Sequence, residues 1–149
     1  MKQVTLTTDG ACAGNPGPGG WAFILRYGQH FIERGGRSAE ETTNNRMEIQ
    51  AAIEGLRALR EPCSVLLVSD SMYLINGITT WRHAWRRGGW VIQRKNNKPV
   101  KNADLWQALD ELLEKHSVEC QWVKGHSGVP DNERCDQLAE LYASGRIPH

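Results

Sequence analysis

The sequence contains no long hydrophobic run. Its longest apolar stretches, residues 21–25 and 65–68, are far shorter than the ~18 residues of a membrane-spanning helix or the roughly 7 to 15 residues of a signal-peptide core. We therefore expect no membrane partner and a cytoplasmic location. The 149 residues suffice for one domain with its own core, because a domain of this size buries ~70% of the surface that its unfolded chain exposes.

Cysteine is scarce, and its spacing shows no metal-binding or disulfide pattern. No Cys-x-x-Cys pair occurs, and no histidine lies at ligand-like spacing from any of the four cysteines, Cys12, Cys63, Cys120 and Cys135. The pattern therefore indicates neither a zinc site nor a disulfide framework. We expect four reduced, buried thiols.

Acidic residues are missing from residues 81–101, which we call the basic stretch. It holds three of the six tryptophans and seven of the 18 basic residues: Arg82, Arg86, Arg87, Arg94, Lys95, Lys98 and Lys101. The rest of the chain has 11 Lys and Arg against 17 Asp and Glu, a net charge of −6, although the whole chain carries +1. A cationic segment on an acidic body suits a polyanion such as a nucleic acid. The alternative is an ordinary solvated surface.

Hydrophobic periodicity predicts three strands at the start of the chain. Residues 3–8 alternate apolar and polar side chains and deliver Asp9 at the strand's end. A second strand covers residues 21–25, and a hairpin turn leads into a third strand that ends at residues 35–36. The glycine-rich residues 14–20 precede a strand instead of a helix, which argues against a dinucleotide-binding loop.

Later in the chain, helical and strand patterns alternate. An apolar stripe over residues 49–59 predicts a helix, and its N-cap is one of three polar residues, Thr43, Asn44 and Asn45. The later elements follow in this order: a buried strand at 65–68, a helix in the basic stretch, a helix capped by Asn102, a strand at 118–123 and a last helix from 130 to 145. The order βββαβααβα indicates a layered α/β domain.

Four acidic residues hold positions from which they could converge. Asp9 and Asp70 end predicted strands, Glu48 lies in the first turn of a helix at the border of its apolar face, and Asp136 lies one position off an apolar helical stripe. The functional crevice of an open α/β sheet lies at the carboxyl ends of its strands. Each acid alone could be a cap or a surface charge. Together they need cations to offset their repulsion, and oxygen ligands favour Mg²⁺ or Mn²⁺ over zinc.

Five successive segments resemble the motifs of the bacterial type 1 ribonuclease H (ribonuclease HI) family. They read TDGACAGNPGPGG, TTNNRMEIQAAI, SDSMYLINGITTW, KPVKNADLW and VKGHSGVPDNERCDQLA, and run in unbroken order to about residue 142. The resemblance implies a single catalytic domain, residues 1–149, with a basic protrusion at about residues 81–101. It also implies a five-stranded mixed sheet, three antiparallel strands and then two parallel ones, flanked by helices.

The same resemblance implies an activity, which is endonucleolytic hydrolysis of the RNA strand of RNA/DNA hybrids without sequence preference. Products would carry 5′-phosphate and 3′-hydroxyl ends. Asp9, Glu48, Asp70 and Asp136 would be catalytic as ligands of two divalent cations, Mg²⁺ with Mn²⁺ as a substitute, and Asp9 is the natural bridging ligand. His126 would be catalytic too, in proton transfer or in product release, although its glycine-flanked loop by itself predicts only an exposed histidine.

The resemblance further assigns substrate contacts. Those to the minor groove are Asn15, Asn44 and Asn45, and those to backbone phosphates are Thr43, Arg46 and Asn102, two of which also suit helix caps. Met72 stands where the family leads us to expect glutamine, so a base-edge hydrogen bond is lost there. In the basic stretch, Trp81 would pack on deoxyribose and Arg86, Arg87 and Lys101 would meet phosphates. Trp85 and Trp90 could bind substrate or form a small core.

The expected partner is an RNA/DNA hybrid duplex, bound by a monomer. A single-stranded-DNA-binding or replication protein is left open as a further partner. Three alternatives are a catalytically silent nucleic-acid-binding module, a protein-interaction module, and another enzyme of this fold such as an integrase or a junction resolvase. A silent binding module would lack one or more of the four acids. A protein-interaction module would leave the acids and His126 unexplained. An integrase or a junction resolvase would need neither the Asn and Thr positions nor the basic stretch.

Overall fold

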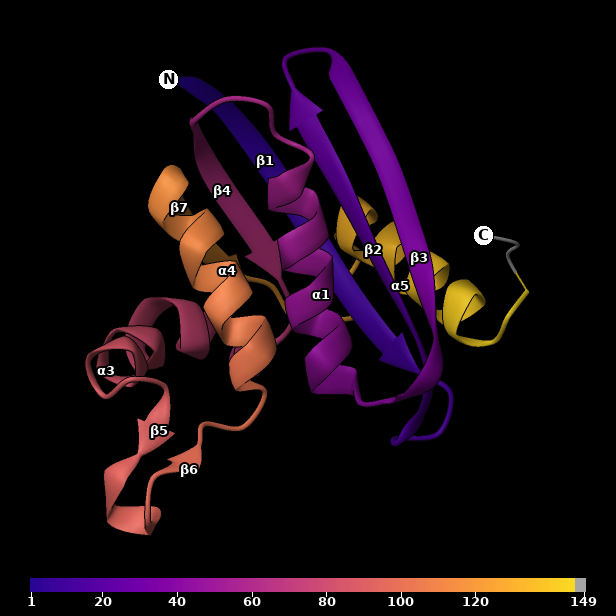
Figure 1. The fold of residues 1–149 in the computed structure, drawn as a ribbon. Helices are drawn as coiled ribbons and strands as arrows, with labels where there is room; N and C mark the ends of the chain where they lie inside the picture. Colours follow the sequence, from indigo (N-terminus) through magenta and orange to yellow (C-terminus); the bar gives the residue numbers. More distant parts are fainter. Residues whose placement is uncertain (147–149) are drawn as a thin grey trace.

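The computed structural model describes residues 1–146, except for the side chain of Ala39, and centres on a five-stranded sheet (Figure 1). In sheet order the strands are β3 (His30–Thr42), β2 (Gly17–Tyr27), β1 (Lys2–Cys12), β4 (Cys63–Ser69) and β7 (Ser117–Trp122). β2 pairs antiparallel with β1 and β3, whereas β4 pairs parallel with β1 and β7. The predicted mixed α/β sheet is therefore confirmed.

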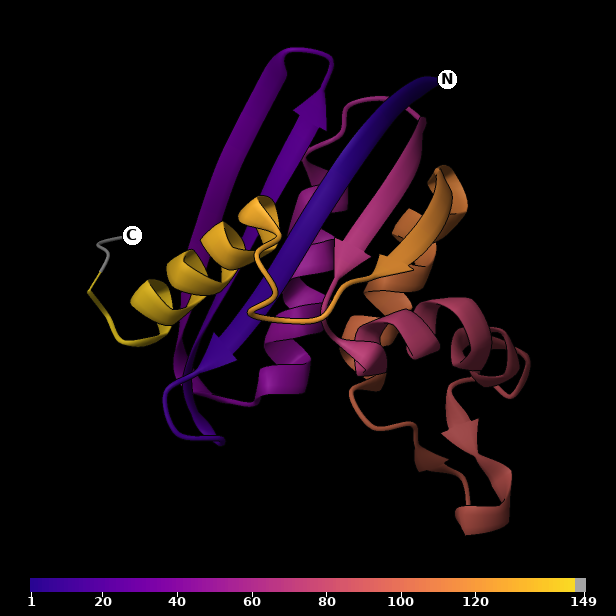
Figure 2. The same ribbon diagram turned by 180° about the vertical axis from the view of Figure 1, so that it is seen from behind.

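Helices cover both faces of this sheet. α1 (Asn44–Arg57) and α4 (Ala103–Lys115) lie on one face, and α5 (Pro130–Ala143) lies on the other (Figures 1 and 2). The main core fills the space under α1 and α4 with side chains that are at most 1% exposed, among them Leu6, Phe23, Ile53, Leu67 and Trp106. A smaller apolar cluster with Cys135 and Ala139 joins α5 to the sheet.

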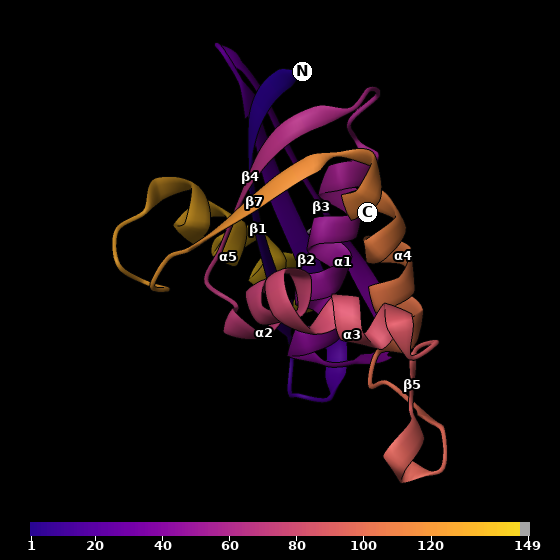
Figure 3. The ribbon, with the colours of Figure 1, turned by 90° about the vertical axis from the view of Figure 1, so that its left-hand side faces the viewer.

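Short elements lead from β4 into the basic stretch. They are α2 (Met72–Asn76), one turn of π-helix (Gly77–Trp81), α3 (Arg82–Arg87) and the antiparallel pair β5 (Val91–Ile92) and β6 (Lys98–Pro99), joined by a 3₁₀ turn (Gln93–Lys95). The β5–β6 ribbon extends away from the sheet and beyond its end (Figure 3). Hydrophobic periodicity did not predict it, because two-residue strands are too short to show a period.

The first strand runs further than its pattern predicts. β1 continues past Asp9 to Cys12 because its antiparallel pairing with β2 extends to Cys12 opposite Gly19. Its parallel pairing with β4 stops earlier, at Thr7 opposite Val68. Asp9 therefore lies just beyond the point where β1 and β4 separate, and the prediction that it ends its strand is wrong.

The third strand also continues through the glycines that were predicted to end it. β3 extends to Thr42, and Gly35 and Gly36 pair with β2 inside the ladder. A Cβ atom added at Gly35 would lie 2.5 Å from Tyr142 Cε2, and one at Gly36 would lie 2.5 Å from Trp21 Cζ2. These glycines make room for aromatic rings and do not mark a turn.

Of the two predicted helix caps, one forms as expected. Thr43 Oγ1 accepts a hydrogen bond from Arg46 N at 3.2 Å, which caps α1. Asn102 precedes α4 in a left-handed conformation with φ of 62°, and its side chain makes no capping bond. Instead its Oδ1 accepts from Arg46 Nη1 at 3.2 Å and its Nδ2 donates to the Tyr73 hydroxyl at 3.0 Å. Asn102 thus joins α1, α2 and α4.

The cysteines are all free thiols, but only two of them are fully buried. Cys63 and Cys135 lie in the two cores, whereas Cys12 and Cys120 are partly exposed. Cys12 ends β1 beside an open cleft and Cys120 lies on the edge strand β7, so neither is covered on all sides. No helix within residues 1–146 is long and apolar enough to cross a membrane.

Candidate active site

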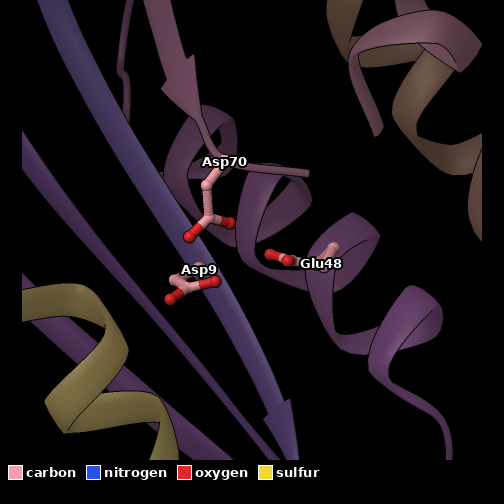
Figure 4. Close-up of side chains that lie close together, drawn as sticks. All are labelled: Asp9, Glu48 and Asp70. Carbon is pink, nitrogen blue, oxygen red and sulfur yellow. The ribbon is translucent and has the colours of Figure 1, made fainter. Parts of the chain in front are cut away.

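Three carboxylates meet at the edge where β1 and β4 separate. Asp9 comes from β1, Asp70 directly follows β4, and Glu48 projects from the first turns of α1 (Figure 4). Each offers one oxygen, and these oxygens all lie within 4.8 Å of one another. The structure therefore brings together three of the four acids that the sequence singles out.

Two glycines allow this close approach. A Cβ atom added at Gly10 would lie 2.5 Å from the backbone nitrogen of Glu48, so only glycine lets the start of α1 pass directly over β1. A Cβ atom added at Gly125 would lie 2.9 Å from Asp70 Oδ2. The sequence analysis did not assign this role to either glycine, although Gly10 could have been recognised from its position directly after Asp9.

The cluster is more deeply buried than the helix pattern predicts. Glu48 is only 8% exposed and Asp9 only 3%, although Glu48 was expected at the border of the helix face that meets solvent. The angular position of Glu48 on the helix does not reveal this burial, because it is Gly10 that lets this side of α1 pack closely against the sheet. Asp9 Oδ1 accepts a hydrogen bond from Gly10 N at 2.9 Å, whereas Glu48 Oε1 is buried with no hydrogen-bond partner within the described residues.

Burial and mutual repulsion make these groups reluctant to ionise. Burial, followed by the charge of Asp70, raises the pKa of Asp9 to about 8. Burial and then the charges of Asp9 and Asp70 raise the pKa of Glu48 well above its ordinary value. Burial also raises the pKa of Asp70. An unpartnered buried oxygen and three crowded carboxyl groups fit a bound divalent cation, which would satisfy the oxygen and offset the charge.

Asp136 and His126 lie at the rim of the same site. Asp136 of α5 lines one cleft of about 560 Å³ together with Asp9, Glu48 and Asp70, but it does not belong to the tight group of three. His126 lies in the loop between β7 and α5 with a φ of 57°, and its side chain is 81% exposed. Its Nδ1 is 3.9 Å from Asp136 Oδ2, so the imidazole can reach the cleft edge while solvent surrounds it.

Replacing Asp9 by asparagine is expected to stabilise the metal-free protein at alkaline pH. The pKa of the Asp9 carboxyl group rises from about 4 in the unfolded chain to about 8 in the folded protein. Its contribution to the stability of the fold is therefore fully present below pH ~4 and is lost as the pH rises through 8. The amide of the Asp9→Asn variant does not ionise, so the variant should gain up to about 5 kcal/mol in unfolding free energy at pH 8.5 and only about 1 kcal/mol at pH 5. Urea unfolding in EDTA at both pH values measures this. An equal gain at both would contradict the assignment.

The predicted minor-groove residues gather beside the cleft. The backbone nitrogen of Asn44 donates to Asn15 Oδ1 at 3.1 Å, which ties the turn after β1 to the start of α1, and Asn44 also lines the cleft. Asn45 is exposed on the next position of α1, and Met72 is 49% exposed at the start of α2. Asn15, Asn44, Asn45 and Met72 are thus accessible to a ligand.

The predicted phosphate contacts around Arg46 already have protein partners. Asp104 holds the Arg46 guanidinium with two hydrogen bonds, of 3.0 Å from Nη1 and 2.7 Å from Nη2, and Asn102 accepts from it as described above. This arrangement raises the pKa of Arg46 and lowers that of Asp104, in each case first through the hydrogen bonds between them. Lys101, which directly precedes Asn102, is exposed.

The tryptophans of the basic stretch are anchored to the main core. Trp85 packs with its ring centroid 5.4 Å from that of the buried Trp106, and Trp90 also packs partly buried against this core. They therefore do not form a separate small core within the stretch. Trp81 is 37% exposed and rests edge-on against Tyr73, with their centroids 6.0 Å apart.

Two arginines of the basic stretch are neutralised by α4. Arg82 is nearly buried and lies 2.7 Å from Asp110, and Arg86 lies 2.6 Å from Glu114. Sequence reasoning missed these acids, although the spacing of four in both helices places each pair on one face. Within residues 1–146, no acid forms an ion pair with Arg87.

Comparisons with known proteins identify similar sequences and a similar fold. The RNase H family model matches residues 1–144. Ribonuclease H of Rhizobium meliloti (strain 1021) is 58% identical over 139 residues, 93% of this chain and 89% of that protein. The crystal structure of LC9-RNase H1, a type 1 RNase H with the type 2 active-site motif, superposes with a TM-score of 0.85 at 30% identity and covers 99% of this chain and 74% of that one.

A more distant solved structure shares the fold alone. LC11-RNase H1, crystallised in complex with an RNA/DNA hybrid, superposes with a TM-score of 0.70 at 18% identity, covering 97% of this chain and 99% of that one. The resemblance of the five sequence motifs is thus confirmed by the family model and by a relative that is identical at more than half of the aligned positions. This chain belongs to the ribonuclease H family.

Proposed function

We propose that this protein is an endonuclease that hydrolyses the RNA strand of RNA/DNA hybrids without sequence preference. The observation that carries the proposal is the buried group of Asp9, Glu48 and Asp70, which shares one cleft with Asp136. The hybrid bound by LC11-RNase H1 supports the substrate class. Membership of the ribonuclease H family supports nuclease chemistry of this kind.

The four carboxylates fit two divalent cations, and the all-oxygen donor set favours Mg²⁺, with Mn²⁺ as a substitute. We assign Asp9 as the ligand that both would share, because its oxygen converges with those of both Glu48 and Asp70. Such a pair, when bound, would supply an activated water for in-line attack and stabilisation of the departing 3′ oxygen, and the products would then carry 5′-phosphate and 3′-hydroxyl ends. The protein itself holds the carboxylate oxygens in fixed positions, and a substrate phosphate would supply the remaining oxygen ligands.

His126 has an exposed position in a glycine-flanked loop, which suits a proton carrier. The glycines stand at positions 125 and 128, and the ring nitrogen of His126 is 3.9 Å from Asp136. An imidazole there can move a proton at the reacting phosphate, or help the product leave by moving next to Asp136. In both roles His126 acts from an exposed loop, whereas the carboxylates act from buried positions.

Substrate binding divides between the two sides of the site. Asn15, Asn44 and Asn45 offer amides to the minor groove, where the 2′-hydroxyl distinguishes RNA from DNA, and Thr43 lies beside them. Met72 adds an apolar contact there. On the other side, Trp81 presents its exposed indole to deoxyribose. Arg87, Lys101 and Asn102 bind phosphates of the DNA strand. Arg46 binds a phosphate there too, and this phosphate competes with Asp104 for the Arg46 guanidinium.

The paired state of Arg86 changes what is expected of its replacement. Arg87→Ala should weaken hybrid binding and reduce the slope of log affinity against log salt by about 0.9, the value for one phosphate contact. Arg86→Ala should change the slope less, because Glu114 already neutralises this guanidinium. Trp81→Ala should lower affinity by about 1 to 3 kcal/mol and leave the slope unchanged, since an apolar contact releases few ions.

These three variants are compared by titrating labelled hybrid at several salt concentrations in Ca²⁺, a cation chosen to prevent turnover during the measurement. Arg34→Ala is the matched control, because this exposed arginine lies on β3, on the far side of the sheet from the basic stretch. A normal slope and affinity for Arg87→Ala would mean that the basic stretch is only a solvated surface.

The substrate assignment is tested by offering the purified protein five labelled substrates in Mg²⁺: the hybrid, double-stranded RNA, double-stranded DNA and each single strand. We expect cleavage of the hybrid alone. Cleavage of double-stranded DNA would favour a resolvase- or integrase-type enzyme, and binding without cleavage would favour a silent binding module.

We further propose a domain organisation, an oligomeric state and a location for this protein. Residues 1–149 act as a single catalytic domain with the basic stretch as its protrusion, the protein acts as a monomer, and it works in the cytoplasm. A complex with a single-stranded-DNA-binding or replication protein stays open beside the hybrid itself. Size-exclusion chromatography with light scattering tests the monomer directly.

A further inference from the structure

One basic side chain, that of Arg146, lines the otherwise acidic cleft. Among the described residues that line it, the charged ones are Asp9, Glu48, Asp70, Asp136, Glu140 and Arg146, so Arg146 is their single basic member. The proposed chemistry uses the first four of these and gives neither Glu140 nor Arg146 a role. Arg146 also lies just beyond residues 1–144, which the family model matches.

The end of α5 fixes the backbone of Arg146. α5 ends at Ala143, and Gly145 follows in the left-handed region with φ of 76°. The backbone nitrogen of Arg146 donates to the Leu141 carbonyl at 3.0 Å and that of Gly145 donates to the Tyr142 carbonyl at 3.0 Å. These two bonds form the Schellman motif that closes a helix on a left-handed glycine. The position of Arg146 against the cleft is thus part of the helix end.

The side chain of Arg146 is oriented, yet its charge is not neutralised. Its Nε donates to Ser144 Oγ at 2.8 Å, while neither Nη atom bonds to any residue in the described part of the chain. Glu140 lines the same cleft, but within residues 1–146 no ion pair joins it to Arg146. Other arginines of the protein are paired with acids at 3.4 Å or less, namely Arg26, Arg46, Arg57, Arg82, Arg86 and Arg134.

We propose that Arg146 binds a phosphate of the RNA strand, next to the phosphate that is cleaved. The inference rests on the proposed function, because cleavage places an RNA phosphate at Asp9, Glu48 and Asp70. The same strand then continues through the cleft, whose wall beyond the carboxylates is built from residues 11–13 and from the end of α5. A planar guanidinium with both Nη atoms unused can bind a phosphate with two hydrogen bonds.

The geometry separates this contact from those of the basic stretch. The end of α5 and the β5–β6 ribbon lie on opposite sides of the molecule (Figure 2). The acidic walls of the cleft repel a phosphate, and a cation at its far end offsets this repulsion where the RNA strand leaves the carboxylates. Arg146 therefore holds the strand that is cut, while the basic stretch holds its complement.

Arg146→Ala is expected to raise the KM for hybrid on the order of 5-fold and to leave kcat unchanged, the result of losing a contact made equally before and during the reaction. The slope of log KM against log salt should fall by about 0.7 to 0.9, because one phosphate is no longer neutralised. Arg146→Lys keeps the charge and should keep the slope. Arg60→Ala, an exposed arginine outside the cleft, is the control and should match the wild type.

Hybrids that carry one uncharged methylphosphonate, placed at successive positions of either strand, identify the phosphate. One position in the RNA strand near the cut should raise the wild-type KM as much as Arg146→Ala does, and should add nothing in that variant. An unchanged KM for Arg146→Ala, additive effects at every RNA position, or non-additivity on the DNA strand would overturn the inference while wild-type cleavage still supports the proposed function. A wild type that cleaves no hybrid would overturn both.

Discussion

Asp70→Asn should lower the rate of hybrid hydrolysis in Mg²⁺ by at least about 10³-fold, which corresponds to about 4 kcal/mol of activation free energy. The substitution preserves shape and removes one charge from the group that Asp70 forms with Asp9 and Glu48. An amide is a poor ligand for the pair of divalent cations that we assign to this site. Single-turnover cleavage of a labelled hybrid measures the loss.

The fold and the binding surface should survive this change. Asp70 follows β4 and its pKa is raised by burial, so removing its charge relieves repulsion in the metal-free protein. Circular dichroism and hybrid affinity in Ca²⁺ check both properties. Glu119→Gln on the exposed edge strand β7 is the matched control and should cleave normally. Near-normal cleavage by Asp70→Asn would remove Asp70 from the metal-binding set.

His126→Ala should slow turnover about 10- to 100-fold while the dependence of rate on Mg²⁺ concentration stays unchanged. The imidazole lies at the rim, 3.9 Å from Asp136 and 81% exposed, and not among the three converging carboxylates. Its loss should therefore affect proton movement or product departure and not metal affinity. Steady-state and single-turnover rates, measured over a range of pH and Mg²⁺, separate these effects.

The two candidate roles of His126 give different results in that experiment. A proton-transfer role predicts that single-turnover and steady-state rates fall together and that the pH profile changes shape. A role in product release predicts a burst of product followed by slow turnover. His30→Ala, at the start of β3, serves as the control. A loss that higher Mg²⁺ restores would contradict both roles.

The sequence predicts the order of helices and strands along the chain and the approximate position of the acids, because both follow from local patterns. Alternation and short apolar runs predict the strands. Asp9 and Asp70 follow closely after the last paired residues of the parallel strands β1 and β4, where the functional crevice of such a sheet lies. The depth of Glu48 is a different matter. It depends on contact between α1 and Gly10, residues that lie far apart in the sequence, and no periodicity within one helix reports it.

The basic stretch illustrates the same limit. Its composition predicts a cationic surface, but the charge that remains available depends on α4, where Asp110 and Glu114 hold Arg82 and Arg86. Likewise, the spacing of the tryptophans cannot reveal that Trp85 packs on Trp106 in the main core. Long-range pairing thus decides which members of a predicted patch can meet a ligand.

The carboxylate cluster should support cleavage of RNA, and only of RNA, when a divalent cation is present. The most direct test is a hybrid whose RNA and DNA strands carry different fluorescent labels, incubated with wild-type protein in Mg²⁺ or in EDTA and resolved by strand length. We expect RNA fragments with 5′-phosphate ends in Mg²⁺, an intact DNA strand in both samples and no fragments in EDTA. DNA fragments in Mg²⁺, or RNA fragments in EDTA at a similar rate, would contradict this expectation.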